Sequence, residues 1–588
     1  MLKGLKRVFG LLLTVTLAVT LLLPQGAVSA LAAEEDSTEQ TVTVSVSNEA
    51  ELIAALQNEA TDVVINLTND ISISTAGTST TGLHMSGTSE QIPYVNDYGI
   101  TQYYTKITTY SRTINGNGYT ISVDEDYTPG NNSALINVST YSELNLYDVT
   151  IDGGLTERCI RVGGSYSTLK MYDGAIVENG GGSGSGNGIY LAGNTSDNAY
   201  LYIYEGSAVK NCVGGSGSTT VNGIGIYATY ADLYLEGEIS GCSVAESDDA
   251  TVTGAVSGGA LYLMRNCNAY IYDTAKIQDN SILGTEGSAC GGAVYVTNNG
   301  NSVYMYGGTV SGNSAFSGGA FYFAGEGNFY LQGGEISSNT AEGGTGGAAY
   351  LSAYANLLIQ DLQSDVSVTG NTASRDSGDG AGFGKGAGFY SIINKGELTI
   401  DTGSSGYSVS VTDNYDIVTT TDEDGNTTQT SQTRDDIFQL YNPLNVSGSV
   451  EISTIRMNED AYLTLGGALT GGSIGIYPLD TTDGAVVAKA ADGYGITSSD
   501  LNHLYSTDVS RSLTMDSDGN VIAQTDSDTA VDISNATLAV NGVTYTGAAQ
   551  EPTVSVLLNG SYLAEGTDLL FLSYIRTRRF PLCRLPDP

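Results

Sequence analysis

The chain has 588 residues, a formal net charge of −42 at pH 7, 76 Gly, 39 Tyr and no Trp. A negative field of this size repels nucleic acid and acidic polysaccharides, so we expect no nucleic-acid partner. The length could hold several cores, but no helical period dominates it, and we expect one elongated unit to use most of the chain.

The first 32 residues are predicted to be an export signal. A basic stretch (Lys3 to Arg7) precedes an apolar run (Leu11 to Leu23) that is too short to span a membrane comfortably, and small residues follow it. A retained N-terminal anchor is the alternative. Because no second long apolar stretch occurs, we expect a mature chain without a transmembrane segment, secreted or at the cell surface. Residues 33–40 are predicted to be a disordered linker.

Residues 41–100 are predicted to form an N-terminal cap and the first coils of a solenoid. Thr41 to Val46 has the pattern of a strand, and Asn48 to Asn58 that of an amphipathic helix. Asn48 is a natural N-cap, and Glu51 stands where a capping box needs an acid. The open end of a solenoid exposes apolar interior and unpaired backbone, so we expect this helix to cover it.

Residues 101–415 contain a repeated phrase that predicts the coils of a β-solenoid. Each copy begins with Gly-Gly-Ala and a short apolar strand, continues with a second strand and a Gly-rich turn, and closes with a third strand ending in Asn. Gly291–Val296, Val303–Tyr306 and Thr309–Asn313 form one such copy. Three strands and three turns per repeat indicate one coil of a parallel β-helix.

Alternation within the second strand assigns apolar residues to the interior and a row of tyrosines to the outside. With about 4.8 Å between rungs, this row is the candidate contact face, because its ring faces are expected to stack on sugar rings or on host-protein side chains. The alternative is that the rings only stabilise neighbouring coils. The predicted ladder consists of Tyr202, Tyr234, Tyr270, Tyr304 and Tyr330.

The asparagines that end the third strands predict a second, structural ladder. Asn tolerates left-handed backbone and suits a tight corner. Stacked in register, the side-chain amides are expected to bond from coil to coil. The predicted ladder consists of Asn179, Asn211, Asn280, Asn313, Asn339, Asn371 and Asn414.

The segment from about residue 40 to 415 resembles known β-helical proteins. The phrases Val63–Leu67, Arg112–Ile121 and Leu146–Gly154 resemble the opening of pectate-lyase-like right-handed β-helices. The Gly-Gly-Ala phrases, and Asn-Ser/Thr-Ala phrases such as Asn313–Ala315, are similar to the repeats of polymorphic outer-membrane proteins and other bacterial surface adhesins. The resemblance implies an all-β fold, a single-stranded right-handed parallel β-helix (solenoid) with a short N-terminal capping helix, without deciding the activity.

The chain beyond the repeats is predicted to change character twice. Residues 416–436 are expected to be a polar insertion, and residues 437–530 C-terminal coils. Residues 531–574 resemble the first half of the Ig-like β modules of Gram-positive surface proteins, and they are too few for a whole sandwich. Residues 575–588 are basic and unpatterned, as a frameshifted or truncated reading frame would be, although a genuine short tail is the alternative.

No catalytic residue is predicted. A pectate-lyase-like site would need carboxylates beside a cationic base, and the one such cluster consists of Asp152, Glu157, Arg158 and Arg161. A salt-bridged surface is the favoured interpretation of that cluster. The acidic pair at 435–436 is assigned to a loop.

Metal and cofactor signals are equally sparse. The six cysteines form no CxxC pair, so we expect them to be small buried or corner residues and to bind no metal. One incidental disulfide between coils is an open alternative, because export permits it. Calcium is the one ion that acidic turns such as Asp422–Asn426 and Asp516–Asn520 would attract, and no other cofactor is expected.

These observations predict a secreted or cell-surface β-helical protein of bacterial type that serves as an adhesin or surface stalk. The expected partner is a glycan or a host or matrix protein. Two alternatives remain open: a polysaccharide lyase or glycoside hydrolase of the β-helix type, and a purely structural surface spacer.

Overall fold

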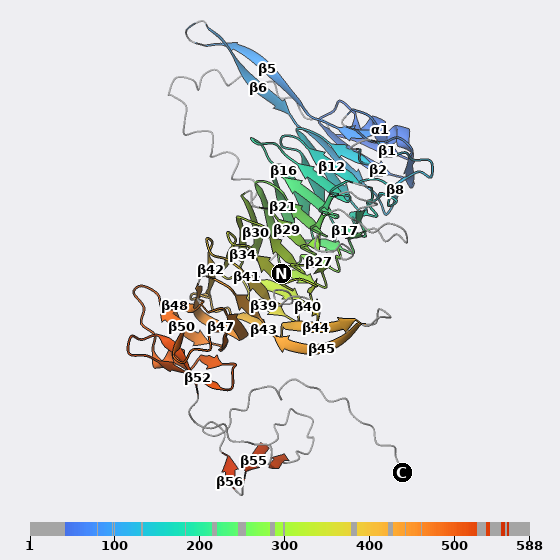
Figure 1. Cartoon of the computed structure of the whole chain (residues 1–588). Helices are drawn as coiled ribbons and strands as arrows, with labels where there is room; N and C mark the ends of the chain where they lie inside the picture. Colours follow the sequence, from blue (N-terminus) through green and yellow to red (C-terminus); the bar gives the residue numbers. More distant parts are fainter. Residues whose placement is uncertain are drawn as a thin grey trace, which may run out of the picture.

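The structure, a computed structural model, is an all-β protein built as a single-stranded right-handed parallel β-helix with a short helix at its N-terminal end (Figure 1). It describes residues 41–525 with short gaps, and three later strands. The predicted export signal, linker and basic tail lie outside the described residues. The gaps fall at residues 79, 97, 99, 131–132, 183, 215–219, 245–254, 283–288, 298–299, 378–384, 422–426, 442 and 460.

Helix α1 (Glu49–Leu56) covers the N-terminal end of the β-helix, as predicted. The Asn48 side chain accepts a hydrogen bond from the backbone N–H of Glu51 at 3.1 Å. The Glu51 carboxylate accepts one from the backbone N–H of Ser47 at 2.8 Å, so the reciprocal bond is made one residue before the N-cap. Leu52, in the middle of the helix, is fully buried.

Each coil contributes one strand to each of three parallel stacks, which we number by the order of strands in the repeat. The first stack contains β4 (Leu83–Met85), β9 (Ile136–Val138), β12 (Ile160–Gly163), β15 (Ile189–Ala192), β20 (Ile226–Thr229), β25 (Leu261–Leu263), β29 (Val294–Val296), β33 (Phe321–Phe323), β37 (Ala349–Leu351), β41 (Phe389–Ser391) and β46 (Ile437–Gln439). The second contains β1 (Val42–Val46), β2 (Asp62–Leu67), β7 (Tyr110–Asn115), β10 (Ser142–Tyr147), β13 (Thr168–Met171), β16 (Ala199–Ile203), β21 (Ala231–Leu235), β26 (Cys267–Ile271), β30 (Asn301–Met305), β34 (Gly327–Leu331), β38 (Asn356–Ile359) and β42 (Leu398–Asp401). The third contains β3 (Ile71–Ile73), β8 (Thr120–Val123), β11 (Thr150–Asp152), β14 (Ile176–Glu178), β17 (Ala208–Lys210), β22 (Glu238–Ser240), β27 (Lys276–Gln278), β31 (Thr309–Ser311), β35 (Gly334–Ser337), β39 (Val366–Thr369) and β43 (Val409–Thr412).

Alternate residues of the strands in these three stacks point inward and form one continuous apolar core. Leu201 pairs with Leu233, for example, and Phe321 with Val294, and all four side chains are fully buried. The outward neighbours of these residues are half-buried, which is the burial alternation that the sequence predicts.

The C-terminal coils close the β-helix in a less regular way. Strand β47 (Leu444–Met457) is long enough to pair in turn with β42, β43 and β46, so it runs along all three stacks. The remaining elements of this end are β48 (Leu463–Gly471), β49 (Ile474–Pro478), β50 (Ala485–Ala490), α2 (Ser498–Leu501), β51 (Leu504–Ser506), β52 (Arg511–Met515) and β53 (Val521–Thr525). Strands β52 and β53 form an antiparallel hairpin around the acidic turn at 516–520.

Short strands at the corners form small additional sheets. They are β18 (Val213–Gly214), β19 (Val221–Asn222), β23 (Ser243–Val244), β24 (Val256–Ser257), β28 (Ala289–Cys290), β32 (Ser314–Ala315), β36 (Thr340–Glu342) and β40 (Thr372–Asp376). The segment predicted as a polar insertion at 416–436 contains an antiparallel hairpin, β44 (Tyr415–Thr421) with β45 (Thr427–Arg434), added to the edge of β40.

A second hairpin was missed by the sequence analysis. Strands β5 (Thr88–Val95) and β6 (Thr101–Thr108) pair antiparallel over eight residues and project from the N-terminal end of the β-helix (Figure 1). The predicted boundary between residues 100 and 101 therefore cuts this hairpin. Its strands are rich in Thr, Tyr and Ile, so they fit the strand pattern of a coil without belonging to one.

Near the C-terminus the structure describes three short antiparallel strands, β54 (Thr537–Val540), β55 (Val554–Leu558) and β56 (Ser561–Leu563). They fall within the segment predicted to be a truncated Ig-like module. The rest of that segment lies outside the described residues, so the Ig-like assignment stays a prediction.

Candidate functional site

The five predicted ladder tyrosines lie in one register on the outward face of the second stack. Tyr202 pairs with Tyr234, Tyr234 with Tyr270, Tyr270 with Tyr304, and Tyr304 with Tyr330. In that order, adjacent ring centroids are 4.5, 5.0, 5.0 and 4.6 Å apart, and adjacent ring planes deviate by 4° to 16°.

Near-parallel stacking at this spacing covers both faces of every interior ring. Tyr234, Tyr270 and Tyr304 therefore present ring edges and hydroxyl groups to solvent. At the N-terminal end of the ladder, the Lys170 ammonium lies 5.8 Å from the centroid of the Tyr202 ring. The expectation that interior ring faces stack on sugar rings is consequently wrong, and what the ladder offers a partner is a row of phenol hydroxyls.

The Tyr202, Tyr234 and Tyr270 hydroxyls are protonated at physiological pH. Burial, together with the neighbouring phenols and Asp232, raises the pKa of Tyr202, Tyr234 and Tyr270 to about 12. A neutral phenol can both donate and accept a hydrogen bond. The row is therefore suited to partners that carry hydroxyl or amide groups.

Two further rows flank the ladder on the same face. Two residues before each ladder position lies a polar row, in which amides bridge neighbouring coils. Asn268 donates to Asp232 at 2.8 Å, Asn328 to Ser302 at 3.2 Å, and Asn356 to Asn328 at 2.8 Å. Two residues after ladder positions, and also outward, lie Tyr204, Tyr272 and Tyr306.

A longer ring stack on the outward face of the first stack was not predicted as a ladder. Adjacent ring centroids in it are 4.5–5.5 Å apart. The signal that could have predicted it is the tyrosine that recurs in the first strand of each coil from Tyr190 to Tyr390. Tyr227 is 9% and Phe438 is 2% exposed, so this stack stabilises the coils more than it offers a surface. Its members are Tyr190, Tyr227, Tyr262, Tyr295, Tyr322, Tyr350, Tyr390 and Phe438.

Two members of the cluster that a lyase would need, Glu157 and Arg158, are used for structure instead. The buried Arg158 guanidinium donates hydrogen bonds of 2.9–3.1 Å to the carbonyl oxygens of Ser133, Ser185 and Gly186. The Glu157 carboxylate, also buried, accepts a hydrogen bond from the Ser133 hydroxyl. Both side chains thereby satisfy buried polar groups around a corner and are closed to a substrate.

The buried asparagines form a continuous hydrogen-bonded stack. In each step a side-chain amide donates to the amide oxygen of the next coil at 2.8–2.9 Å, and the backbone N–H of the same residue donates to that oxygen at 3.0–3.2 Å. The members are fully buried. They are Asn280, Asn313, Asn339, Asn371 and Asn414.

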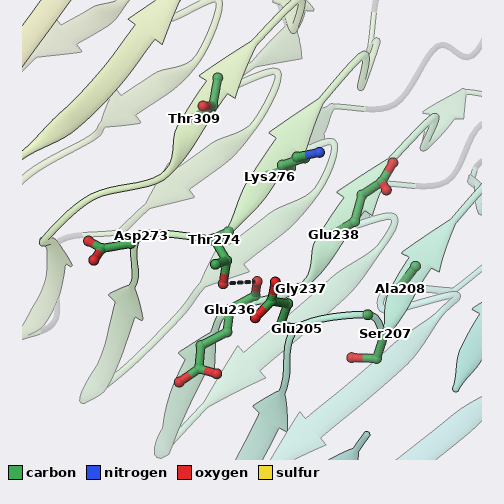
Figure 2. A pocket seen from close by; sticks show the side chains of 12 residues that line it. Glu205, Ser207, Ala208, Glu236, Gly237, Glu238, Asp273, Thr274, Lys276 and Thr309 are labelled. Carbon is green, nitrogen blue, oxygen red and sulfur yellow. Dashed lines mark hydrogen bonds between the residues drawn. The ribbon is translucent and has the colours of Figure 1, made fainter. Parts of the chain in front are cut away.

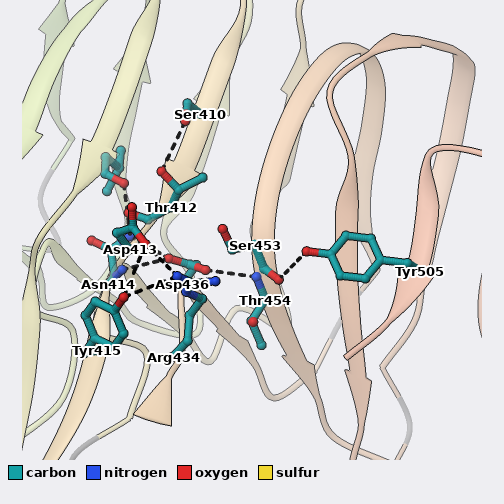
Figure 3. Close-up of polar contacts among 11 residues, drawn as sticks. Ser410, Thr412, Asp413, Asn414, Tyr415, Arg434, Asp436, Ser453, Thr454 and Tyr505 are labelled. Atoms are coloured by element: carbon teal, nitrogen blue, oxygen red, sulfur yellow. Dashed lines mark hydrogen bonds and ion pairs between the residues drawn. The ribbon is translucent and has the colours of Figure 1, made fainter. Parts of the chain in front are cut away.

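The stack ends on a buried carboxylate instead of an amide. Asn414 donates through its backbone and its side chain to one oxygen of Asp436, and the backbone N–H of Thr454 donates to the other at 2.9 Å (Figure 3). Burial raises the pKa of Asp436 to about 7 against these three donors. The acidic pair at 435–436 lies in the loop between β45 and β46, as predicted, but both side chains are fully buried, which the sequence did not indicate.

Asn179 and Asn211 do not belong to this stack. They occupy the preceding corner position, with φ of +52° and +54°, where later coils carry left-handed Gly241 and Gly312. The buried slot beside Asn211 holds Cys212. Two consecutive corner positions both accept Asn, for different physical reasons. The predicted ladder therefore includes Asn179 and Asn211, which lie one position before the buried slot.

The neighbouring Asp435 shares a cation with Asp416, a second buried acid. One nitrogen of the Arg456 guanidinium, Nη1, lies 3.2 Å from a carboxylate oxygen of each. Burial first, and then the charge of Asp435, raises the pKa of Asp416 well above its usual range. The register places Asp416 in the slot that holds Ala341 and Ala373 in the two preceding coils.

A shallow cavity of about 390 Å³ lies at the corners of the middle coils (Figure 2). Glu205, Glu236, Glu238 and Asp273 line it together with Lys276. Throughout the described part of the chain, His, Cys, Asp and Glu side chains form no group of three or more that could hold a metal ion. Asp422–Asn426 lies outside the described residues, so calcium at the acidic turns stays a prediction.

The coil geometry defines the class of fold: a right-handed parallel β-helix. Residues 43–179, from β1 to the end of β14, match the family described as Putative pectate lyase-like adhesive domain. A search of curated proteins found no match to the chain. Among the residues that the structure describes, no helix is both long and apolar enough to cross a membrane.

Proposed function

We propose that this protein is a secreted or cell-surface adhesin that binds a glycan or a host or matrix protein through the outward face of the second stack. The observation that carries the proposal is the continuous row of tyrosine hydroxyls beside a row of amides and carboxylates. The match of residues 43–179 to an adhesive domain supports it.

The geometry favours weak contacts repeated many times. Each coil adds one phenol hydroxyl about 4.8 Å from the last, on a scaffold held rigid by its core and its asparagine stack. A partner with regularly spaced hydroxyl or amide groups can bond to several rungs at once, and several weak contacts made together multiply the affinity.

A purely structural spacer is the second candidate, because ring stacking alone accounts for the covered ring faces. Enzyme action on a polysaccharide is the less favoured alternative, since Arg158 and Glu157 are buried among the groups they bond. The two leading candidates differ in what the phenol hydroxyls do.

We expect the triple variant Tyr234→Phe, Tyr270→Phe and Tyr304→Phe to bind at least about tenfold more weakly to cells or to an array of glycans and matrix proteins. The substitutions remove three hydroxyls and keep the stacked rings. The free energy of unfolding should therefore change by less than about 1 kcal/mol, as measured by guanidinium denaturation.

The matched control is Tyr262→Phe, Tyr295→Phe and Tyr390→Phe in the longer ring stack of the first face. It removes the same number of hydroxyls from a different face, so binding should equal that of the unmodified protein. Binding that survives the first triple unchanged would assign the ladder to structure alone, and a complete lack of binding by the unmodified protein would make the protein a spacer. An equal loss in both triples would move the contact away from the ladder.

A further inference from the structure

The β5–β6 hairpin is the one described part of the N-terminal half that stands clear of the coils (Figure 1). Every residue of its strands is exposed except Ile92 and Thr108, which are half-buried. An isolated two-stranded ribbon is marginally stable in water and gains stability when one face is covered. We therefore ask which of the two faces of this ribbon a partner could cover.

Cross-strand register assigns the residues of the hairpin to its faces, since directly paired residues share a face. Tyr103 pairs with Pro93, whereas Tyr104 pairs with Ile92 on the opposite side. The face of Tyr103 contains no charged residue, and the face of Tyr104 carries Glu90 and Lys106. The uncharged face consists of Ser89, Gln91, Pro93, Val95, Thr101, Tyr103, Thr105 and Ile107.

The uncharged face holds large apolar side chains in water. Val95 is 67%, Tyr103 is 63% and Ile107 is 45% exposed. Tyr104 contacts Tyr94 at a centroid distance of 6.2 Å, but no ring within the described residues contacts Tyr103. Tyr103 can therefore offer a ring face, which the interior rungs of the tyrosine ladder cannot.

Polar residues flank Tyr103 on the same face. Thr101 and Thr105 lie two residues before and after Tyr103 on the same face, and Gln91 donates to the Thr105 hydroxyl at 2.7 Å. An aromatic platform with hydroxyl and amide groups beside it complements a sugar ring, which has apolar C–H faces and a polar rim. The same arrangement leaves no ion pair for a charged ligand.

Charge and area select the occupant. The whole chain has a net charge of −42, so it repels an acidic polymer. A cationic polymer gains no ion pair from an uncharged face. Two strands of eight residues present about 260 Å² per face, far below the roughly 800 Å² per partner of a stable protein interface. A second copy is therefore a poor occupant, whereas a polymer with many identical sites can bind through repeated weak contacts.

We propose that the uncharged face of the β5–β6 hairpin, centred on Tyr103, binds a neutral polysaccharide. The inference rests on the adhesive function proposed above, but it uses a surface separate from the tyrosine ladder. The hairpin then acts as a contact arm that projects from the acidic coils at the end of the β-helix.

Affinity gel electrophoresis of the full chain tests this proposal. Three neutral polysaccharides, hydroxyethyl cellulose, mannan and dextran, are set into native gels, with polygalacturonate as the acidic counterpart. We expect at least one neutral polymer to retard the protein and polygalacturonate not to do so. Tyr103→Ala should weaken the retardation at least about tenfold.

Tyr104→Ala is the matched control, because it removes the same ring from the adjacent position and the charged face. The neutral polymer should retard Tyr104→Ala as much as it retards the unmodified protein. Tyr103→Ala and Tyr104→Ala should both have the circular dichroism spectrum of the unmodified protein. The Tyr234, Tyr270 and Tyr304 phenylalanine triple should also be retarded normally, which separates this site from the ladder.

Three outcomes would overturn the proposal. One is that none of the three neutral polymers retards the unmodified protein. Another is that Tyr103→Ala and Tyr104→Ala lose retardation equally. The third is a dimer, detected by light scattering, that Tyr103→Ala converts to a monomer, since the face would then be an interface between copies.

Discussion

Replacing Asn339 by alanine is expected to lower the free energy of unfolding by about 3–5 kcal/mol. Asn339 is fully buried in the middle of the asparagine stack. Its amide oxygen accepts two hydrogen bonds from Asn313, and its amide nitrogen donates to Asn371 and to the Val310 carbonyl. Alanine removes these four hydrogen bonds and leaves the backbone N–H of Asn313 without its acceptor, and the low dielectric of the interior makes that loss costly. Guanidinium denaturation of the full chain measures the change.

Asn211→Gly is the control for this prediction. Asn211 is exposed, has φ of +54° and occupies the corner slot that holds Gly241 and Gly312 in later coils. Glycine accepts that backbone without strain, so the free energy of unfolding should stay within about 0.5 kcal/mol. If both variants lost the same stability, or if Asn339→Ala lost none, the stack would not be what holds the coils in register.

Replacing Asp416 by alanine is expected to stabilise the protein at pH 8, by about 1–3 kcal/mol. Asp416 and Asp435 are both buried and share the same nitrogen of Arg456, so two carboxylates compete for one cation. Alanine removes one buried charge and leaves Asp435 paired with Arg456. The slot already holds Ala341 and Ala373 in the preceding coils, so the smaller side chain fits the local packing.

The advantage of Asp416→Ala should depend on pH with a definite sign. Burial and the charge of Asp435 raise the folded-state pKa of Asp416 above its unfolded value, and the cations Arg456 and Lys385 oppose the shift only in part. A raised pKa means that the folded state binds the proton more tightly. The contribution of the neutral acid is therefore fully present below the unfolded pKa and is lost as the pH rises through the raised folded value.

Thermal unfolding of Asp416→Ala and of the unmodified protein from pH 4 to pH 8 measures this dependence. The difference in melting temperature should grow with pH. Asp413→Asn is the control, because Asp413 is largely exposed in its ion pair with Arg434, and such a pair contributes about 0–1 kcal/mol. A difference that shrinks as the pH rises would contradict the assignment of the raised pKa to Asp416.

Much of the fold could be predicted because the coils repeat. Register repeats with period two along each strand and once per coil along the axis, so the interior and exterior of Tyr234 and its neighbours follow from alternation alone. The cap at Asn48 was equally accessible, because an N-cap is a local bond between a side chain and a backbone three residues away.

The candidate site was predictable only as a row of residues. Register places Tyr234 beside Tyr270, but register does not say whether the rings lie face to face. That orientation decides that the interior ring faces are covered and that the hydroxyls are left at the surface. The hairpin around Tyr103 was missed because a strand inside a coil and a strand outside one have the same composition.

The sequence by itself determined the parallel β-helix, the capping helix and the register of the tyrosine ladder, since all three depend on local pattern and on repetition. Only the tertiary structure decided which of two consecutive corner positions is buried, which excluded Asn211 from the stack. Only it placed the acids at 435–436 in the interior beside Arg456. Burial and shared partners depend on contacts between residues that are distant in the chain, and no local pattern encodes such contacts.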